Sequence, residues 1–400
     1  MTECENCKRL EKRIAELEKR LAAYENAHTP SSHRIFKQKP RQSNGKIGRP
    51  EGIKGSTRTF PKPDRQVEKK FNDCPNCKGK LTFLYNESMI REDIPKPQPV
   101  IVTEFIANHY HCSNCGEVVA KPEECPDGRF GINVLVHCSM SRYEDRLPFR
   151  KIHNFLKRNY NLEITPASIM NMTRKVSEKI EPEYHKIIDK IRISPFVHAD
   201  ETSMSINGIN FWIWIFVAKD AVLCIIRKSR GKKVVREILG EYKGIVICDG
   251  WRAYLGFAFI IQRCWAHLLR EAFALDNKKI FELLHNLFLD AKNRKLTRDI
   301  AEERLRKIIS RKHRDKKAMS LLQKIENGFN YWFTFLTYDV EPTNNAAEQA
   351  LREHVVIRKI IGCLRSLKGA NVHEIMMSCF ATWKMQGLNL FDTLTNFLRS

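Results

Sequence analysis

Residues 196–249 alternate short apolar runs with turn signals, and this pattern predicts a β-sheet at the centre of the chain. Asn207-Gly208 between two such runs is a strong hairpin signal. Residues 231–239 then favour a helix, and residues 244–249 a buried strand. The three runs before the helix have the length of strands: residues 196–204, 209–217 and 221–228. Three antiparallel strands, a helix and a further strand are the order of an RNase H-like fold, so we expect an α/β catalytic domain.

Two acids occupy special places in this pattern. Asp200 lies in the middle of the first strand, and Asp249 ends the fourth, 49 residues later. In the expected order these strands are neighbours, so the two carboxylates should converge. Each acid alone has a plainer interpretation, because surface Asp is common and Asp-Gly often only turns the chain. An acid inside an apolar strand is less ordinary, because burying an uncompensated charge is costly.

A third acid, Glu348, stands where Pro, Thr and Asn signal the start of a helix. Arg352 is four residues further and shares its face, which sets a cation for phosphate beside a carboxylate. An ion pair within the helix is the alternative. Hard cations such as Mg²⁺ prefer clustered carboxylate oxygens. Two such ions about 4 Å apart can activate an attacking hydroxyl and stabilise a leaving oxygen.

The charge of the chain points to a polyanionic partner. Its 400 residues suit two or three domains, and the formal net charge is +23, with a pI near 9.5. Proteins this basic usually bind polyanions by neutralising phosphates and releasing counterions. A ribosomal or membrane-surface protein would show the same charge, so composition favours nucleic acid without proving it.

The N-terminal part divides into a helix and a basic linker. In residues 1–27, apolar residues alternate four and three apart, which predicts a short coiled-coil helix or an ordinary amphipathic one. Cys4 and Cys7 within it could also bind metal. Residues 28–70 hold twelve Lys and Arg against three acids, which predicts a flexible DNA-binding linker or merely a solvated one. Gly48-Arg49-Pro50 resembles a minor-groove hook. The basic candidates are Lys46, Arg49, Lys54 and Arg58.

Two Cys-x2-Cys pairs predict a structural zinc ribbon at residues 71–125. The pairs are Cys74 with Cys77 and Cys112 with Cys115. Each spacing folds a tight turn that directs two thiolates at one Zn²⁺ ion. Redox pairs or free thiols are the alternative, and Cys125, His109 and His111 are not expected to be ligands. Residues 81–85 and 100–111 should form the strands of the ribbon.

Residues 126–194 favour helices that allow a helix-turn-helix. One helix should span residues 148–160, with a turn at Asn161, and Thr165-Pro166 should begin another that runs to about Ile180. Arg174 and Lys175 lie on the second helix. A plain helical connector has the same pattern.

Cysteine usage and hydropathy suggest a soluble intracellular protein. The thirteen cysteines are an odd number, and no signal peptide precedes them, so metal ligands or buried thiols fit better than disulfides. The most apolar stretch, residues 209–218, is about half the length that spans a bilayer. We therefore expect no membrane association and a cytoplasmic location, on the nucleoid when the protein binds DNA.

Taken together, these residues resemble the transposases of the insertion sequence 66 family, which belong to the DDE group. The likeness covers nearly the whole chain, and its most specific segments are the Thr-Asn-Asn-x-x-Glu and Cys-x-Ala-His motifs. Departures are modest: the N-terminal region is compact, and the glycine-rich stretch after the Glu348 helix is reduced to Gly362, Gly369 and neighbours. The matching segments are His198-Ala-Asp-Glu-Thr202, Cys248-Asp-Gly-Trp251 with Tyr254, Gln262-Arg-Cys-Trp-Ala-His-Leu-Leu-Arg270, Thr343-Asn-Asn-Ala-Ala-Glu348, and a tail from Ser378 through Ala381-Thr382 to Gly387-Leu388.

The resemblance implies a DNA transposase with an RNase H-like domain at residues 195–400 and a helical insertion at about 271–338, including a helix over residues 298–317. It implies Asp200, Asp249 and Glu348 as the catalytic triad on Mg²⁺ or Mn²⁺. It also implies that His267 and Arg270 lie near the active site and contact DNA, although His267 could be a buried residue at a helix start.

The expected reaction is hydrolysis at the ends of the element, followed by attack of the freed 3′-OH on target DNA. The expected partners are transposon ends and target DNA, a second copy of the chain in a homo-oligomer, and accessory proteins of the same element. Two other functions use the same features. One is a zinc-ribbon DNA-binding regulator with a silent catalytic domain, and the other is a junction-resolving nuclease.

Overall fold

The computed structural model describes residues 14, 62–123, 128–275, 278–311 and 315–399. The chain divides into two units, residues 1–94 and 95–400, and each is described by itself. Among the described residues, no helix combines the length and apolar character needed to cross a membrane.

A five-stranded mixed sheet is the centre of the second unit, with strand order β5-β4-β3-β6-β7. Strands β3, β4 and β5 are antiparallel, whereas β6 and β7 run parallel to β3. The bounds of the strands are β3 Phe196–Ile206, β4 Ile209–Val217, β5 Val222–Arg227, β6 Ile245–Cys248 and β7 Ile260–Arg263. The α/β class is therefore confirmed, and the predicted hairpin turns at Asn207 and Gly208, both at positive φ.

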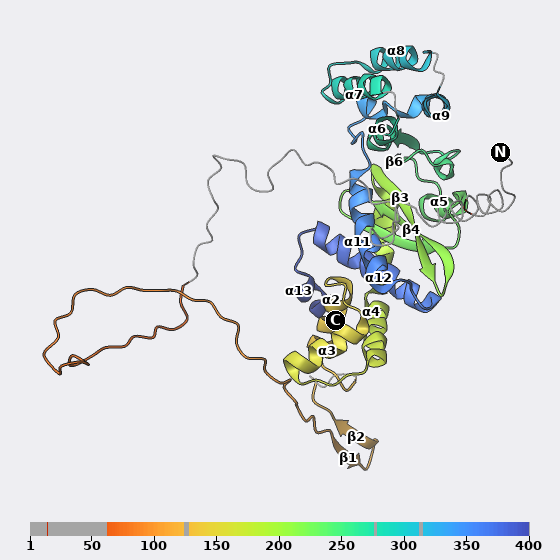
Figure 1. The fold of residues 1–400 in the computed structure, drawn as a ribbon. Helices are drawn as coiled ribbons and strands as arrows, with labels where there is room; N and C mark the ends of the chain where they lie inside the picture. Colours follow the sequence, from red (N-terminus) through yellow and green to blue (C-terminus); the bar gives the residue numbers. More distant parts are fainter. Residues whose placement is uncertain (1–13, 15–61, 124–127, 276–277, 312–314, 400) are drawn as a thin grey trace, which may run out of the picture. The chain divides into compact units, whose positions relative to one another are not determined.

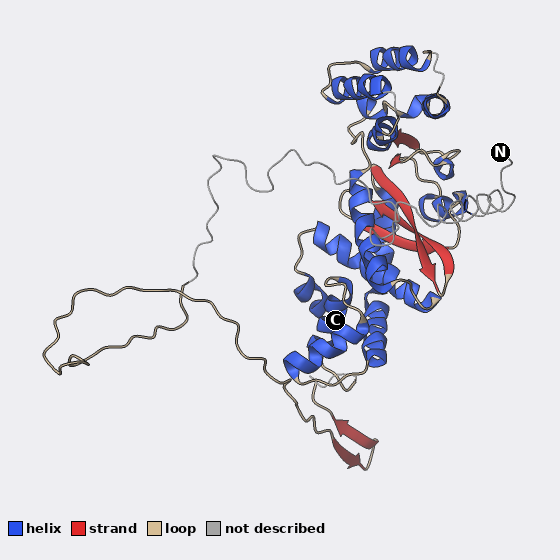
Figure 2. Ribbon diagram, in the orientation of Figure 1, coloured by secondary structure: helices blue, strands red, loops and turns tan. Residues whose placement is uncertain are grey.

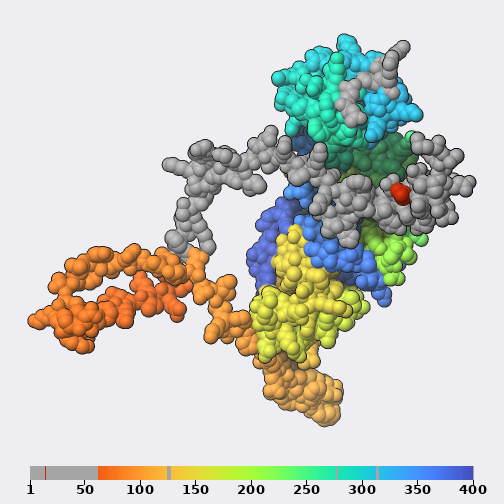
Figure 3. Space-filling model, viewed as in Figure 1, coloured from red at the N-terminus to blue at the C-terminus, as the bar shows by residue number. Residues whose placement is uncertain are grey.

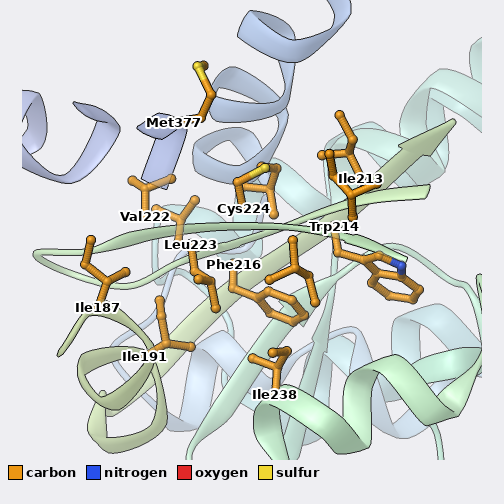
Figure 4. Packing of buried hydrophobic residues seen from close by; sticks show 14 of the residues in the cluster. Ile187, Ile191, Ile213, Trp214, Phe216, Val222, Leu223, Cys224, Ile238 and Met377 are labelled. Carbon is orange, nitrogen blue, oxygen red and sulfur yellow. The ribbon is translucent and has the colours of Figure 1, made fainter. Parts of the chain in front are cut away.

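Helices cover both faces of this sheet (Figures 1 and 2). Helix α5 (Lys232–Leu239) and the end of α4 (Pro166–Ile193) lie on one face, and α11 (Asn345–Ile361) and α12 (Leu367–Met385) lie on the other. Figure 4 shows how the strands alternate between them: Trp214 and Phe216 point towards Ile238, whereas Ile213 and Cys224 point towards Met377. The main hydrophobic core is therefore two layers divided by the sheet.

Helices α2 (Ile132–Tyr143), α3 (Phe149–Tyr160) and α13 (Leu390–Arg399) pack beside α4. The predicted turn is present: Asn161 has a left-handed φ of 50°, and the Thr165 hydroxyl accepts a hydrogen bond from the Ser168 N–H. The predicted end of α4 at Ile180 is wrong, because the helix continues through Pro182 to Ile193. Buried residues of α4 on both sides of Pro182 pack against the sheet and α12. The free energy of this packing outweighs the one backbone hydrogen bond that proline removes.

A second hydrophobic core lies between residues 265 and 335. In the space-filling view its helices α7–α9 form a lobe, coloured teal to cyan (Figure 3). The predicted helix over residues 298–317 is wrong in extent, because α8 ends at Ile309 and α9 begins at Lys316 after an Asp315 cap. The helices are α6 Trp265–Phe273, α7 Lys278–Lys292, α8 Arg298–Ile309, α9 Lys316–Glu326 and α10 Thr334–Thr337.

Between residues 62 and 123 the regular structure is a hairpin of β1 (Asn108–Cys112) and β2 (Gly116–Ala120), apart from an isolated bridge between Asp73 and Lys80. The strand predicted at residues 81–85 is therefore wrong, and of the one predicted at residues 100–111 only the end is a strand. The side chains of residues 83–85 are apolar and exposed. No described strand pairs with this segment, so its local preference for a strand does not lead to one.

Candidate functional site

The two strand acids lie next to each other across the parallel pair β3 and β6. His198 of β3 pairs with Ile247 of β6. This is the last pair of the ladder, and two residues further along each segment come Asp200, in the middle of β3, and Asp249, just past the end of β6. Neighbouring strands lie about 4.8 Å apart, so the two acids are near each other at the carboxyl end of β6, and the charge of Asp249 acts on the Asp200 carboxyl.

Asp200 lies in a strongly negative environment. Burial is the main cause that raises the pKa of its carboxyl to about 7. The charges of Glu201, Asp249 and, more weakly, Glu348 raise it further, whereas the Glu201 N–H opposes the shift by donating to Asp200 Oδ1 at 2.9 Å. Carboxylates that repel one another offer oxygen ligands of the kind that divalent cations prefer, but in the described part of the chain the ligand atoms of Asp200, Asp249 and Glu348 do not all lie within 4.8 Å of one another.

Glu348 approaches from the first turn of α11 and pairs with two side chains of α6. Arg270 Nη2 donates to its two carboxylate oxygens at 2.6 and 2.8 Å, and His267 Nδ1 is 3.5 Å from Oε1. Arg352 is exposed one turn further along α11, and the carboxylate uses Arg270 as its partner. Burial is the main cause that lowers the pKa of His267, which favours its neutral form. The structure thus brings His267 and Arg270 to Glu348.

Asn344 fixes the start of α11 to the sheet, a role that the sequence did not reveal. Its Nδ2 donates to the Ala199 carbonyl at 2.8 Å, and its Oδ1 lies 3.2 Å from His198 Nδ1. Its carbonyl accepts from the Glu348 N–H at 3.1 Å. Asn344 is fully buried. Its position at the helix start suggested a side-chain cap, but its side chain makes no cap hydrogen bond. It links the backbone beside Asp200 to the turn that carries Glu348.

The segment after β7 connects this site to the second core. The Cys264 N–H donates to the Cys248 carbonyl at 2.8 Å, and the Trp265 N–H donates to the Pro342 carbonyl at 3.0 Å. The Trp265 indole N–H donates to the Trp332 carbonyl at 2.6 Å. One short segment therefore ties together β6, the chain before α11 and the helices of the lobe.

Cysteine, histidine and glutamate also meet at this point. Among the residues that the structure describes, Cys264, His267 and Glu348 form a cluster whose potential ligand atoms all lie within 4.8 Å of one another. This cluster contains one of the three predicted acids, and Cys264 was not among the predicted site residues. The Cys-x2-His spacing was visible in the sequence, but its glutamate partner 81 residues after His267 was not.

Comparison with known proteins places this geometry in a family. Residues 127–372, more than half of the chain, match the family model described as "Transposase IS66 family". The chain belongs to this family of transposases. A curated protein of Sinorhizobium fredii (strain NBRC 101917 / NGR234), "Uncharacterized protein y4qI", is 20% identical over 315 residues. The match covers 66% of this chain and 58% of that protein, so the chain spans somewhat over half of its relative's length.

In this chain, Glu201 has a different environment from Asp200, because successive residues of a strand face opposite sides of the sheet. Its buried carboxylate accepts from Arg230 Nε and from the Tyr254 hydroxyl, both at 2.9 Å. The Arg230 guanidinium lies between the rings of Trp212 and Trp251, at 4.5 and 4.3 Å from their centroids. Burial and the charge of Asp249 raise the pKa of the Glu201 carboxyl, and the bonds from Tyr254 and Arg230 oppose this rise.

Trp251 joins this ion pair to the site. Its backbone N–H donates to Asp249 Oδ1 at 2.8 Å, and its indole N–H donates to the Arg230 carbonyl at 3.0 Å. Trp251 is 39% exposed, although the Arg230 guanidinium lies over its ring. The Cys-Asp-Gly-Trp segment therefore orients one oxygen of the second acid.

The first cysteine pair of the chain forms a tight turn. The Cys74 N–H donates to the Gly79 carbonyl and the Lys78 N–H to the Cys74 carbonyl, both at 2.9 Å. Hydrogen bonds from the backbone N–H groups of Cys77 and Asn76 lower the pKa of the Cys74 thiol.

The second cysteine pair lies at the end of the β1–β2 hairpin, where Gly116 has a φ of +80°. Here the N–H groups of Asn114 and Cys115 lower the pKa of the Cys112 thiol. Both turns thus favour thiolates, which is what a metal-binding pair requires. His109, set aside as a ligand in the sequence, pairs with Glu117 at 2.6 Å.

Several predicted residues lie outside the described part of the chain. Of the predicted coiled-coil segment, residues 1–27, only Ile14 is described, so Cys4 and Cys7 lie outside the described residues. Cys125 and the basic candidates Lys46, Arg49, Lys54 and Arg58 lie outside them as well.

Proposed function

We propose that this IS66 transposase cuts DNA at the ends of its element and joins the freed 3′-OH to target DNA. The observation that supports this most directly is the β3–β6 register, which ends at His198 and Ile247, each two residues before one of the acids Asp200 and Asp249. The strand order and the two-sided helical cover agree with the RNase H-like fold proposed for residues 195–400. Residues 271–338, rich in charged helix, are proposed to be its insertion.

The acidic residues fit divalent cations of the hard class, Mg²⁺ or Mn²⁺, because they offer oxygen ligands on two strands and a helix. We propose that Asp200 and Asp249 hold both ions and that Glu348 completes one site. Ions bound there supply an activated attacking oxygen and a stabilised leaving oxygen. The rest of the work is positioning and charge neutralisation.

Glu348 needs to leave its partner before it serves as a ligand in this scheme. Arg270 now occupies both carboxylate oxygens, and its side chain is 58% exposed. We propose that Arg270 moves to a DNA phosphate when DNA enters. Its guanidinium would then pair with Glu348 in the absence of DNA and with the substrate phosphate in the complex. The exposed Arg352 and the partly exposed His267 would contact the strand beside it.

The other segments are proposed to bring DNA to this site. Residues 28–70 supply a basic linker with Lys46, Arg49, Lys54 and Arg58, and residues 126–194 a helix-turn-helix. Residues 71–125 are proposed to be a zinc ribbon on Cys74, Cys77, Cys112 and Cys115, and residues 1–27 a coiled coil that joins two copies.

The test is strand cleavage and joining with the element's own ends in Mg²⁺ or Mn²⁺. Asp200→Asn, Asp249→Asn and Glu348→Gln should each reduce cleavage by at least about 100-fold, while DNA binding persists. Glu353→Gln on α11 and Asp220→Asn are matched controls, because these acids pair with Arg146 and Lys190 away from the site. Full cleavage by any triad variant would remove that residue from the catalytic role.

The same assay separates the other functions. A regulator would bind the ends without cutting them. A junction-resolving nuclease would cut branched DNA but would not join a 3′ end to target.

A further inference from the structure

A cysteine and a histidine stand beside Glu348 in the spacing of a metal site. Cys264 is the N-cap residue of α6, and His267 lies in the first turn of the same helix. Together with Glu348 they place one sulfur, one nitrogen and one carboxylate oxygen within 4.8 Å of one another. The three ligands come from the starts of two helices that the Asn344 contacts hold in place.

The contacts of His267 and Cys264 suit a bound metal, whereas both oxygens of Glu348 accept from Arg270, which a metal would have to displace. His267 Nδ1 is buried and makes no hydrogen bond to any described residue, although Glu348 Oε1 is 3.5 Å away. Cys264 Sγ is buried, which raises the pKa of the thiol, and it accepts from the Asn344 N–H at 3.1 Å, a contact that opposes this rise. A buried ring nitrogen without a partner is costly, and a bound cation would satisfy it.

The donor set selects the kind of ion. Thiolate and imidazole are ligands of Zn²⁺ and similar borderline-soft ions, whereas Mg²⁺ prefers oxygen alone. Three protein ligands leave a fourth tetrahedral position for water. The Asp200–Asp249 pair offers only oxygen, so the two neighbouring sites should prefer different metals.

We propose that Cys264, His267 and Glu348 bind Zn²⁺ or an ion of similar softness, and that Glu348 is shared between this site and Asp200 and Asp249. Zn²⁺ bound here displaces the exposed Arg270 and holds Glu348 on the α6 side. The consequence for activity rests on the proposed cleavage function: zinc at this site withdraws a ligand of the catalytic ions and inhibits cleavage.

Metal binding is tested without any DNA. The full chain is stripped with a chelator and reloaded with Co²⁺, and the bound metal and the thiolate-to-cobalt absorption are measured. Cys264→Ser and His267→Gln should each bind one ion fewer per chain than wild type, and Cys264→Ser should also lose part of the thiolate band. Serine keeps an acceptor for the Asn344 N–H, and unfolding curves check that both variants fold.

Two comparison variants locate the loss. Cys363→Ser removes a partly exposed cysteine outside the cluster and should bind as much Co²⁺ as wild type. Cys74→Ser should lose an ion independently, so the double variant Cys74→Ser/Cys264→Ser should lose both. Wild-type metal content in folded Cys264→Ser and His267→Gln would overturn the proposed site.

The shared glutamate is tested by titrating Zn²⁺ into the Mg²⁺-dependent cleavage assay. Wild type should be inhibited, and Cys264→Ser should need at least about tenfold more Zn²⁺ for the same inhibition. Equal inhibition of both proteins would refute the sharing of Glu348. Absence of cleavage by every protein would instead refute the proposed function, while the cobalt result would still decide the metal site.

Discussion

Two consecutive acids, Asp200 and Glu201, show how much a single position along a strand decides. Asp200 is directly opposite Ile215 on the face that α11 covers, where Asn344 and Glu348 approach it. Glu201 faces the other side, where Arg230 and Tyr254 satisfy its carboxylate. The two neighbouring carboxyls therefore have different surroundings. Other acids surround Asp200, so a bound cation would stabilise its charged form, whereas Glu201 already accepts hydrogen bonds from Arg230 and Tyr254.

A buried pair of histidines makes a pH-dependent prediction at the residue scale. His354 Nδ1 and His373 Nε2 are 3.1 Å apart in the core, and burial lowers the pKa of His354 from 6.5 to about 4. The unfolded chain takes up a proton between these two values and the folded chain does not. The stability contributed by neutral His354 is therefore complete above pH 6.5 and is lost as pH falls towards 4. The loss should amount to about 3 kcal/mol.

Urea unfolding between pH 7.5 and pH 4.5 measures this dependence. His354→Asn retains a polar group near Nδ1, and its unfolding free energy should fall less with decreasing pH than that of wild type. Other groups titrate in the same range, so the difference between the two proteins is the readout. His185→Asn on the exposed face of α4 should follow wild type. A wild-type slope in His354→Asn would contradict the prediction.

At the scale of elements, α12 closes an open edge of the sheet. β5 is an edge strand, and edge strands carry unpaired backbone groups. The Ser378 hydroxyl accepts from the Cys224 N–H at 2.8 Å and donates to the Cys224 carbonyl at 3.3 Å. In the same way, the Thr382 hydroxyl accepts from the Val222 N–H at 2.9 Å and donates to the Val222 carbonyl at 3.1 Å. Four residues further towards the start of the helix, Glu374 accepts from the Ile226 N–H at 2.9 Å. Side chains one turn apart thus replace a missing sixth strand.

Removing these hydroxyls should destabilise the sheet. Ser378→Ala and Thr382→Val each leave a buried N–H and carbonyl of β5 without a partner, at a cost of about 1–3 kcal/mol. Denaturant unfolding of each variant measures the loss. Thr395→Val is the matched control, because the hydroxyl of this buried threonine of α13 donates to the Phe391 carbonyl of its own helix and has no other hydrogen-bond partner among the described residues. If the control lost as much as the two variants, edge closure would not be the cause.

The difference between α12 and the central strands shows what the sequence could predict. The strands between residues 196 and 249 were predictable, because apolar runs and the Asn207-Gly208 turn are local signals. The adjacency of Asp200 and Asp249 followed from strand order. By contrast, the strand expected at residues 81–85 is absent, and the contacts of Asn344, Cys264 and Ser378 depend on partners 80 or more residues away. No local pattern carries that information.

At the scale of the whole molecule, the net charge of +23 makes a prediction about salt. DNA binding should weaken linearly in a plot of log affinity against log salt, with a slope of about −0.9 per neutralised phosphate. Lys46→Ala/Arg49→Ala should therefore make the slope shallower by about 1.8 if each side chain contacts one phosphate.

Arg49→Lys keeps the charge but not the planar guanidinium, so it should retain the slope and lose preference for A·T-rich DNA. Fluorescence anisotropy with A·T-rich and G·C-rich duplexes over a range of salt tests both statements. An unchanged slope in the double alanine variant would show that this part of the linker does not contact DNA, and the +23 charge would then have to act through the described helices and lobe.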